Sequence, residues 1–149
     1  TIFFFTIPPC LTMASPIKDW TAPSLCFIEA YSKDSLYLTE QDAIYLCSGA
    51  HDSWAPIDCI EQMNFPKDSI SDNSVALFLC SGATSASAPA ECFYQVYNSE
   101  KLDFTFEEAL HLCQKAKSAS APIHCFWQAF SIEGLGLPIT KAIELCRGA

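Results

Sequence analysis

The chain is poor in positive charge and has no long apolar stretch. Lysine and arginine contribute 8 of the 149 residues against 17 aspartates and glutamates, which gives a net charge of −9. Nucleic acids and anionic membrane surfaces both attract basic surfaces. We therefore expect no nucleic-acid partner, and any electrostatically steered partner should be cationic. No stretch reaches the roughly 18 to 20 apolar residues of a transmembrane helix, so we expect no stable membrane insertion.

The sequence also lacks the short motifs that carry familiar chemistry. It contains no Cys-x-x-Cys pair, serine nucleophile elbow, phosphate-binding glycine loop or zinc-protease helix motif. Asn-x-Ser/Thr is absent as well, so N-glycosylation is not expected. Acidic residues such as Glu40, Asp42, Glu107 and Glu108 are explained by helix starts without catalysis. We assign no catalytic residue and no cofactor, and we expect that the protein is not an enzyme.

Cysteine, in contrast, is abundant and regularly placed. Eight of the nine cysteines form two series with a period of 33 residues: Cys26, Cys59, Cys92 and Cys125, and Cys47, Cys80, Cys113 and Cys146. Identical spacing without insertions indicates four copies of one unit. We place these repeats at residues 22–54, 55–87, 88–120 and 121–149.

The cysteine positions do not vary among the repeats, whereas neighbouring apolar positions do. One such position is occupied in turn by Phe27, Ile60, Phe93 and Phe126. A cysteine that served only as a small buried hydrophobe would be replaced by alanine or valine in some copy, so we expect the thiols to form disulfides. Disulfides persist in oxidising compartments, and we predict a secreted or periplasmic protein.

The N-terminal segment fits this compartment. Residues 1–7 are apolar, two prolines follow, and small residues occupy the −3 and −1 positions of a cleavage site after Ala14. We interpret residues 1–14 as the remnant of a secretory signal peptide and residues 15–21 as an N-terminal extension. The alternative is an apolar segment that packs on the first repeat. Cleavage after Ala14 would remove Cys10 and leave an even number of cysteines.

Each repeat carries the signals for two short helices. The first begins with Ala-Pro, where proline loses no hydrogen bond because the N–H of a first helical turn is unpaired. The second begins at an N-cap with an acidic residue three positions on, at Thr39 and Thr105, and Asp72 takes the same place in the second repeat. It ends at a glycine that supports the left-handed conformation: Gly49, Gly82 and Gly148. Lys115 replaces this glycine in the third repeat, so we expect that helix to run on or fray through residues 114–117.

Two helices per repeat at this period predict an all-α fold, a short disulfide-braced α-solenoid of four αα-hairpin repeats of about 33 residues each. Helices of about ten residues are not stable alone. Packing and cross-links must therefore hold them.

Two regular disulfide schemes are compatible with the repeats. In the first, each bond crosses the linker between repeats: Cys47–Cys59, Cys80–Cys92 and Cys113–Cys125. In the second, each bond closes one hairpin: Cys26–Cys47, Cys59–Cys80, Cys92–Cys113 and Cys125–Cys146. Either loop is worth roughly 3 kcal/mol, so the energy of loop closure does not decide between them. We favour the second scheme, because it uses all eight repeat cysteines and joins helix ends that lie side by side in an αα-hairpin.

The recurring Leu-Cys-x-Gly-Ala and Ala-Pro-x-x-Cys-Phe segments, as in Leu46–Ala50 and Ala121–Phe126, resemble tandem cysteine repeats of secreted bacterial proteins of unassigned function. The resemblance covers residues 22–149. It implies a secreted repeat protein, and it brings no active site with it.

Residue types that bind zinc occur near corresponding helix ends: His111, Cys113, His124 and Cys125. The repeat register argues against a metal site, because the position of His111 is taken in the other repeats by Tyr45, Phe78 and Glu144. Such variation is typical of a surface position, and the cysteines have disulfide partners in either scheme. We assign no metal site.

Trp54 lies in a linker where the other repeats have serine or threonine, so it has no repeated role in a core. Together with Tyr45 and His51 it is our candidate contact for a peptide or sugar. Coverage of a seam between repeats is the alternative.

We therefore predict a secreted or periplasmic, disulfide-stabilised repeat protein that acts as a protein- or peptide-binding or scaffold module. A small extracellular enzyme or enzyme accessory unit that uses acidic surface residues is one alternative, and a structural spacer is another. Non-repeated surface residues gathered on one concave face would favour binding. Carboxylates converging in a deep pocket would favour catalysis, and a uniformly polar surface would favour the spacer.

Overall fold

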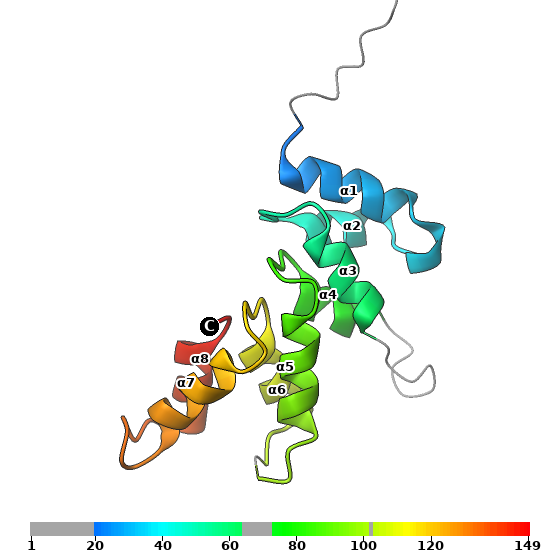
Figure 1. Cartoon of the computed structure of the whole chain (residues 1–149). Helices are drawn as coiled ribbons and strands as arrows, with labels where there is room; N and C mark the ends of the chain where they lie inside the picture. The colour runs from blue at the N-terminus through cyan, green and yellow to red at the C-terminus, as the bar shows by residue number, and fades with distance from the viewer. Residues whose placement is uncertain (1–19, 64–72, 102) are drawn as a thin grey trace, which may run out of the picture.

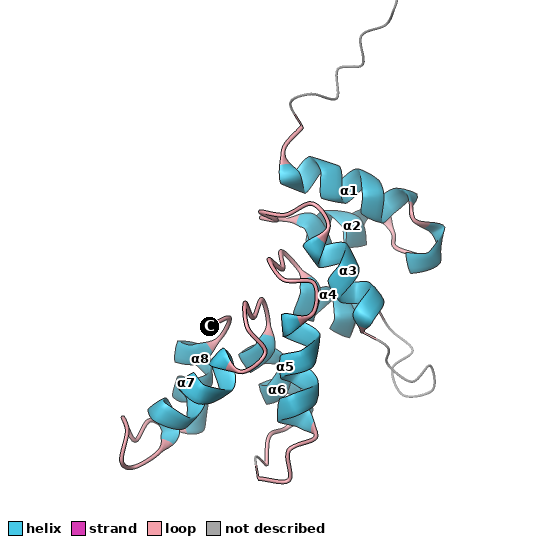
Figure 2. Cartoon of the chain, in the orientation of Figure 1, coloured by secondary structure: helices cyan, strands magenta, loops and turns pink. Residues whose placement is uncertain are grey.

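The computed structural model describes residues 20–63, 73–101 and 103–149, and this part of the chain is helical without strands (Figure 2). Eight α-helices follow one another in four pairs: α1 (Ala22–Ser32) with α2 (Glu40–Cys47), α3 (Ala55–Gln62) with α4 (Ser74–Cys80), α5 (Ala88–Tyr97) with α6 (Phe106–Cys113), and α7 (Ala121–Phe130) with α8 (Ile139–Cys146). A 3₁₀ helix, η2 (Asp34–Leu36), lies between α1 and α2. The predicted signal-peptide remnant at residues 1–14, with Cys10, and the predicted cap Asp72 lie outside the described residues.

The helix pairs stack along one direction as a short solenoid (Figure 1). The two helices of each pair contact each other, the odd-numbered helices contact one another in sequence from α1 to α7, and the even-numbered helices do so from α2 to α8. Each repeat thus contributes one helix to each of two layers. The predicted all-α fold of disulfide-braced hairpin repeats is confirmed.

One disulfide closes each hairpin, by joining the odd-numbered helix to the last residue of its even-numbered partner. The bonds are Cys26–Cys47, Cys59–Cys80, Cys92–Cys113 and Cys125–Cys146, each spanning 21 residues. The Cα atoms lie 5.6 Å apart in the first three bonds and 5.5 Å apart in the fourth. This is the within-repeat scheme.

The helix starts follow from the local sequence. Every odd-numbered helix has proline in its first turn. Thr39 and Thr105 form the predicted caps of α2 and α6: each hydroxyl accepts the N–H three residues on at 3.2 Å, and the acidic side chain there accepts the threonine N–H in return. The hydroxyl of Thr39, and then its N–H, hold the pKa of Asp42 below its ordinary value.

Three of the odd-numbered helices, α1, α5 and α7, carry an aromatic stack at positions four residues apart. The ring centroids of Phe27 and Tyr31 are 5.7 Å apart, those of Phe93 and Tyr97 5.5 Å, and those of Phe126 and Phe130 5.2 Å, with interplanar angles of 8°, 8° and 15°. Residues at this spacing lie on one face of a helix, and stacking of this kind adds about 1 kcal/mol beyond the area buried.

Hydrogen bonds between repeats form at the turn that follows each even-numbered helix. The N–H of Gly82 donates to the Leu46 carbonyl at 2.8 Å, and the same bond recurs from Lys115 to Leu79 and from Gly148 to Leu112, at 3.4 Å each. The carbonyls in the last turn of a helix have no partner within it. In the second, third and fourth repeats, the turn therefore supplies a hydrogen-bond donor to a carbonyl at the helix end of the repeat before it. These bonds fix the register between neighbouring repeats.

The turn of the third repeat differs from our expectation. Helix α6 ends at Cys113 like its counterparts, and Lys115 adopts a φ of +60°, close to the +63° of Gly82. The prediction that this helix runs on or frays through residues 114–117 is therefore wrong. The hydrogen bond from the Lys115 N–H to the preceding repeat favours this left-handed conformation, although a residue with a side chain adopts it less readily than glycine does.

We predict which tryptic peptides remain linked in the oxidised protein. Cleavage after lysine and arginine separates Cys113, Cys125 and Cys146 onto the peptides 102–115, 118–141 and 142–147. Mass spectrometry of a non-reduced digest should find 118–141 bound to 142–147 and released by reductant. A species that joins 102–115 to 118–141 would show the between-repeat bond and contradict the structure.

Replacement of Gly82 by alanine tests the register between repeats. A Cβ at this position would lie 3.0 Å from the carbonyl oxygen of Ser48, at a φ of +63°. Gly49 is the matched control, because its φ is +70° but no described atom lies within 4 Å of an added Cβ. In urea denaturation we expect Gly49→Ala to lower the free energy of unfolding by about 1 kcal/mol and Gly82→Ala by about 2 to 3 kcal/mol. Equal losses would show that the close approach of the repeats is unimportant.

Candidate functional site

The three residues predicted as a ligand contact are exposed, and they lie on neighbouring segments. Tyr45 is on α2, His51 is in the turn that follows α2, and Trp54 directly precedes α3. The carboxylate of Asp52 accepts the N–H groups of Trp54 and Ala55 at 2.7 and 2.8 Å and so shapes this turn. These bonds, that from Ala55 first, hold the pKa of Asp52 below its ordinary value. Of the three predicted residues, His51 lines the groove described next, and Tyr45 and Trp54 are not part of its lining.

A groove of about 360 Å³ runs along the turns that follow the even-numbered helices. These turns project on one side of the array, where the C-terminus also lies (Figure 1). The groove contains turn glycines and side chains from all four repeats: His51, Thr84, Gln114, Lys115, Lys117 and Arg147. Because the hydrogen bonds between repeats hold the turns in register, the groove is a product of the stacking.

Positive charge is concentrated in this groove. Lys115, Lys117 and Arg147 line it, and they are three of the six lysines and arginines among the described residues of a protein with a net charge of −9. In the described part of the chain, none of the three forms an ion pair, and the pairs present are Lys33–Glu61 and Lys141–Glu144. Lys141 lowers the pKa of Glu144 through its hydrogen bond and charge, and Arg147 lowers it to a smaller extent.

The basic residues of the groove depart from the repeat pattern. Lys115 stands where the other repeats have glycine, Arg147 where they have serine or glutamine, and Lys117 where they have His51 and Thr84. In the sequence, Lys115 indicates only an irregular helix end, and it does not by itself predict this site. The sequence does contain an indication of the site: the three substitutions, in the third and fourth repeats, all introduce a basic residue in the turn that follows the second helix of the repeat. They gather along the edge formed by the turns.

Lys115 adopts a backbone conformation that is unfavourable for a residue with a side chain. A φ of +60° is left-handed, and it costs such a residue about 1 to 2 kcal/mol relative to ordinary helical geometry. The side chain extends over Gly82, with Cε and Nζ 3.6 and 3.7 Å from the position that a Cβ of Gly82 would occupy. The third turn thus directs an ammonium group along the groove, at a position where glycine would be less strained.

The residues considered for zinc are not arranged as ligands. Cys113 and Cys125 are bonded to Cys92 and Cys146, and the ring of His111 packs edge-on against Phe78 with centroids 5.2 Å apart. Within residues 20–63, 73–101 and 103–149, no group of three or more histidine, cysteine, aspartate or glutamate side chains could hold a metal ion. Of the acidic residues considered for catalysis, Asp42 and Glu108 are engaged in the capping boxes.

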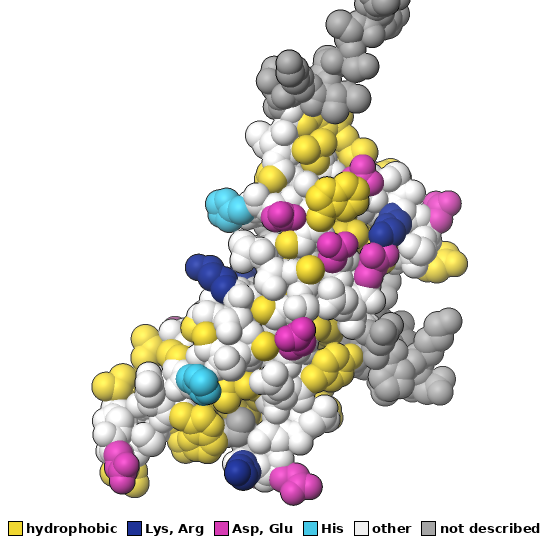
Figure 3. All heavy atoms as spheres, in the orientation of Figure 1, with side chains coloured by type: hydrophobic (Ala, Val, Ile, Leu, Met, Phe, Trp, Pro, Cys, Tyr) yellow, Lys and Arg dark blue, Asp and Glu magenta, His cyan; other side chains and the backbone are white. Residues whose placement is uncertain are grey.

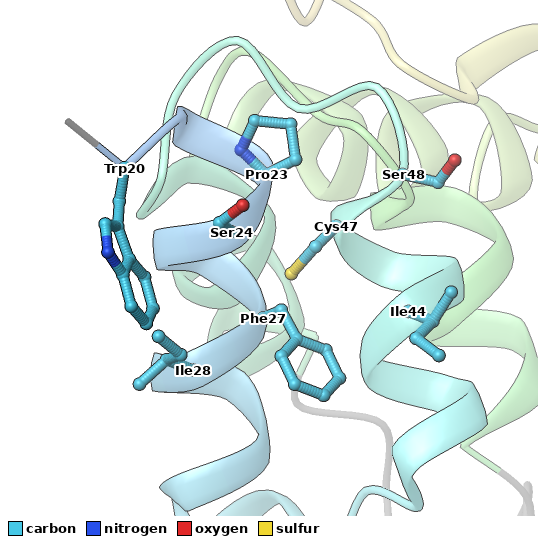
Figure 4. Close-up of a pocket in the computed structure, with 8 residues that line it drawn as sticks. All are labelled: Trp20, Pro23, Ser24, Phe27, Ile28, Ile44, Cys47 and Ser48. Atoms are coloured by element: carbon cyan, nitrogen blue, oxygen red, sulfur yellow. The ribbon is translucent and has the colours of Figure 1, made fainter.

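A second hollow, of about 450 Å³, lies at the first repeat (Figure 4). Its lining is mainly apolar, with Trp20, Phe27 and Ile28 from the α1 side and Ile44 from α2. Ser24 and Ser48 supply the hydroxyl groups. It offers little charge or hydrogen bonding to orient a small polar ligand.

Among the described helices, none is long and apolar enough to cross a membrane. Comparisons of the chain with protein-family models, with curated proteins and with solved structures found no match. The resemblance to secreted bacterial cysteine repeats therefore stays a prediction.

Proposed function

We propose that the protein is a disulfide-braced binding module, secreted or periplasmic, whose groove of turns holds a short acidic segment of a protein or peptide. The observation that carries the proposal is a group of three cations, Lys115, Lys117 and Arg147, which line one groove of an otherwise acidic protein and form no ion pair with a described residue. Four intramolecular disulfides support an oxidising compartment.

The electrostatics favour an anionic ligand at this position. Cations held close together repel one another, and a carboxylate placed among them removes that repulsion and gains charge-assisted hydrogen bonds. The conformation of Lys115 adds to the argument, since strained backbone is typical of functional sites. The hydroxyl of Thr84 can donate a hydrogen bond to a peptide carbonyl, and so can the second N–H of the Gln114 amide, whose Nε2 also donates to the Phe78 carbonyl at 3.1 Å.

The remaining surface limits the size of the anion. A long polyanion such as nucleic acid would extend beyond the groove, over a surface on which acidic side chains of several repeats are exposed (Figure 3). A segment of a few residues would stay within the basic region. An acidic ligand is the opposite of the cationic partner expected from the net charge, because the net charge does not show that three cations gather in one groove.

Binding of a fluorescently labelled Glu/Asp-rich peptide, followed by anisotropy at low salt, tests the proposal. We expect Lys117→Gln and Arg147→Gln each to raise Kd about 3- to 5-fold, which corresponds to loss of one exposed ion contact of about 0.7 to 1 kcal/mol. Lys115→Gly should weaken binding similarly and raise the midpoint of urea unfolding, because glycine relieves the positive φ. Affinity should fall as salt increases.

Lys101→Gln is the matched control, since Lys101 is exposed and lies outside the groove. A lysine-rich peptide of the same length controls for nonspecific attraction to the acidic surface. Equal effects of Lys101→Gln and the groove variants, or tighter binding of the basic peptide, would contradict the assignment of the site.

A further inference from the structure

The first repeat exposes a face that every later repeat buries against its predecessor. Ile44 on α2 is 47% exposed, whereas the residues at the same repeat position are nearly covered: Leu77 at 6%, Leu110 at 8% and Ile143 at 6%. Pro23 is partly exposed, while its counterparts Pro56, Pro89 and Pro122 are fully buried. The apolar hollow at the first repeat is therefore the stacking surface of a repeat that has no described neighbour on that side.

This face keeps its apolar character although it is open. Phe27 lies between α1 and α2, and Ile44 lies on α2 beside it (Figure 4). Trp20 and Ile28 extend the apolar surface along α1, and both are more than a third exposed. Terminal repeats of solenoids ordinarily carry a polar outer face, which keeps them from stacking further.

The fourth repeat exposes the opposite face. Leu145 on α8 is 58% exposed, whereas its counterparts Leu46, Leu79 and Leu112 are completely buried by the repeat that follows each of them. Cys125 is likewise partly exposed, while Cys26, Cys59 and Cys92 are fully buried. The two ends of the described array are thus the two halves of one recurrent contact.

The polar groups of that contact are also open at the two ends. In the second, third and fourth repeats, the N–H at the position of Gly49 donates to the leucine carbonyl of the repeat before it. Within the described residues, the N–H of Gly49 has no such acceptor, and the carbonyl of Leu145 receives no bond from another repeat. Ser81 donates its hydroxyl to the carbonyl of Tyr45 at 2.9 Å, and Ser48 is its counterpart in the first repeat.

We propose that copies of this protein stack head to tail, with the fourth repeat of one copy on the first repeat of the next. The contact continues the solenoid: the face of Leu145 covers the face of Ile44, and the N–H of Gly49 donates to the carbonyl of Leu145 in the neighbouring copy. A second copy is the occupant because the same contact already joins the first repeat to the second, the second to the third and the third to the fourth. In each case the face equivalent to that of Leu145 covers the face equivalent to that of Ile44. Gly49 lines the groove, but the contact uses only its backbone N–H and needs neither Lys117 nor an acidic ligand, so the assembly does not rest on the proposed function.

The two faces differ, so the contact does not close on itself as a symmetric dimer does. A heterologous contact of this kind adds copies at both ends and gives an open series of oligomers. This property distinguishes the proposal from a dimer in which two apolar hollows face each other.

Sedimentation velocity of the oxidised full chain over a range of concentrations tests the assembly. We expect the weight-average mass to rise with concentration and to pass that of a dimer. Ile44→Glu blocks one face and Leu145→Glu the other, so each variant alone should be monomeric. An equimolar mixture of the two should form a 1:1 dimer and nothing larger, because each variant retains one intact face.

Tyr37→Glu is the matched control, since Tyr37 is an 86% exposed aromatic residue outside both faces, and this variant should assemble like the unmodified protein. Ser24→Arg blocks the first face from an exposed position, should Ile44→Glu disturb folding. A chain that stays monomeric at every concentration would overturn the proposal. This result is expected if another part of the same chain covers the hollow at the first repeat. Self-association of Leu145→Glu alone would overturn it as well, since it would reveal a symmetric contact.

Discussion

The disulfide that joins the two helices of each hairpin is the constraint on which the rest of the structure depends. The α-helices are only 7 to 11 residues long, too short to persist in water by themselves. A bond that closes a loop of about 20 residues contributes about 3 kcal/mol, so four bonds contribute on the order of 12 kcal/mol. That is comparable to the whole stability of an ordinary domain. Because the bond occupies the same place in every repeat, the four hairpins are alike, and alike hairpins present the same stacking faces.

The turns after the even-numbered helices lie side by side in the stacked array, and together they form the groove that holds the basic side chains. Its left-handed residue donates an N–H to the helix end of the preceding repeat, and this lines up the four turns. The geometry is imposed by the neighbour, so even Lys115 adopts it. The backbone N–H makes the recurrent contact, and the side chains of Ser81 and Gln114 add hydrogen bonds to the preceding repeat, so side chains of different kinds are accepted at these turns. Basic residues in the third and fourth repeats therefore form a groove without disturbing the fold.

The period, the caps and the disulfide pairing could be predicted because each depends on residues close in sequence or on exact repetition. Thr39 and Thr105 cap their helices through bonds three residues away, and the cysteine spacing indicates the hairpin. The end of α6 could not be predicted, because an acceptor in another repeat sets the conformation of Lys115. The groove could not be predicted for a similar reason: Lys115 and Lys117 are distant from Arg147 in the chain, and stacking of the repeats brings them together. Ile44 and Leu145 occupy positions that are apolar in every repeat, so the sequence does not reveal that they are exposed.

The cross-links, more than the packing of short helices, hold this fold. Far-UV circular dichroism of the protein before and after complete reduction, without denaturant and with thiol titration to confirm eight freed cysteines in the repeats, tests it directly. We predict that the helical spectrum is largely lost on reduction and returns on reoxidation. A fully reduced protein that keeps its helical spectrum would contradict the account.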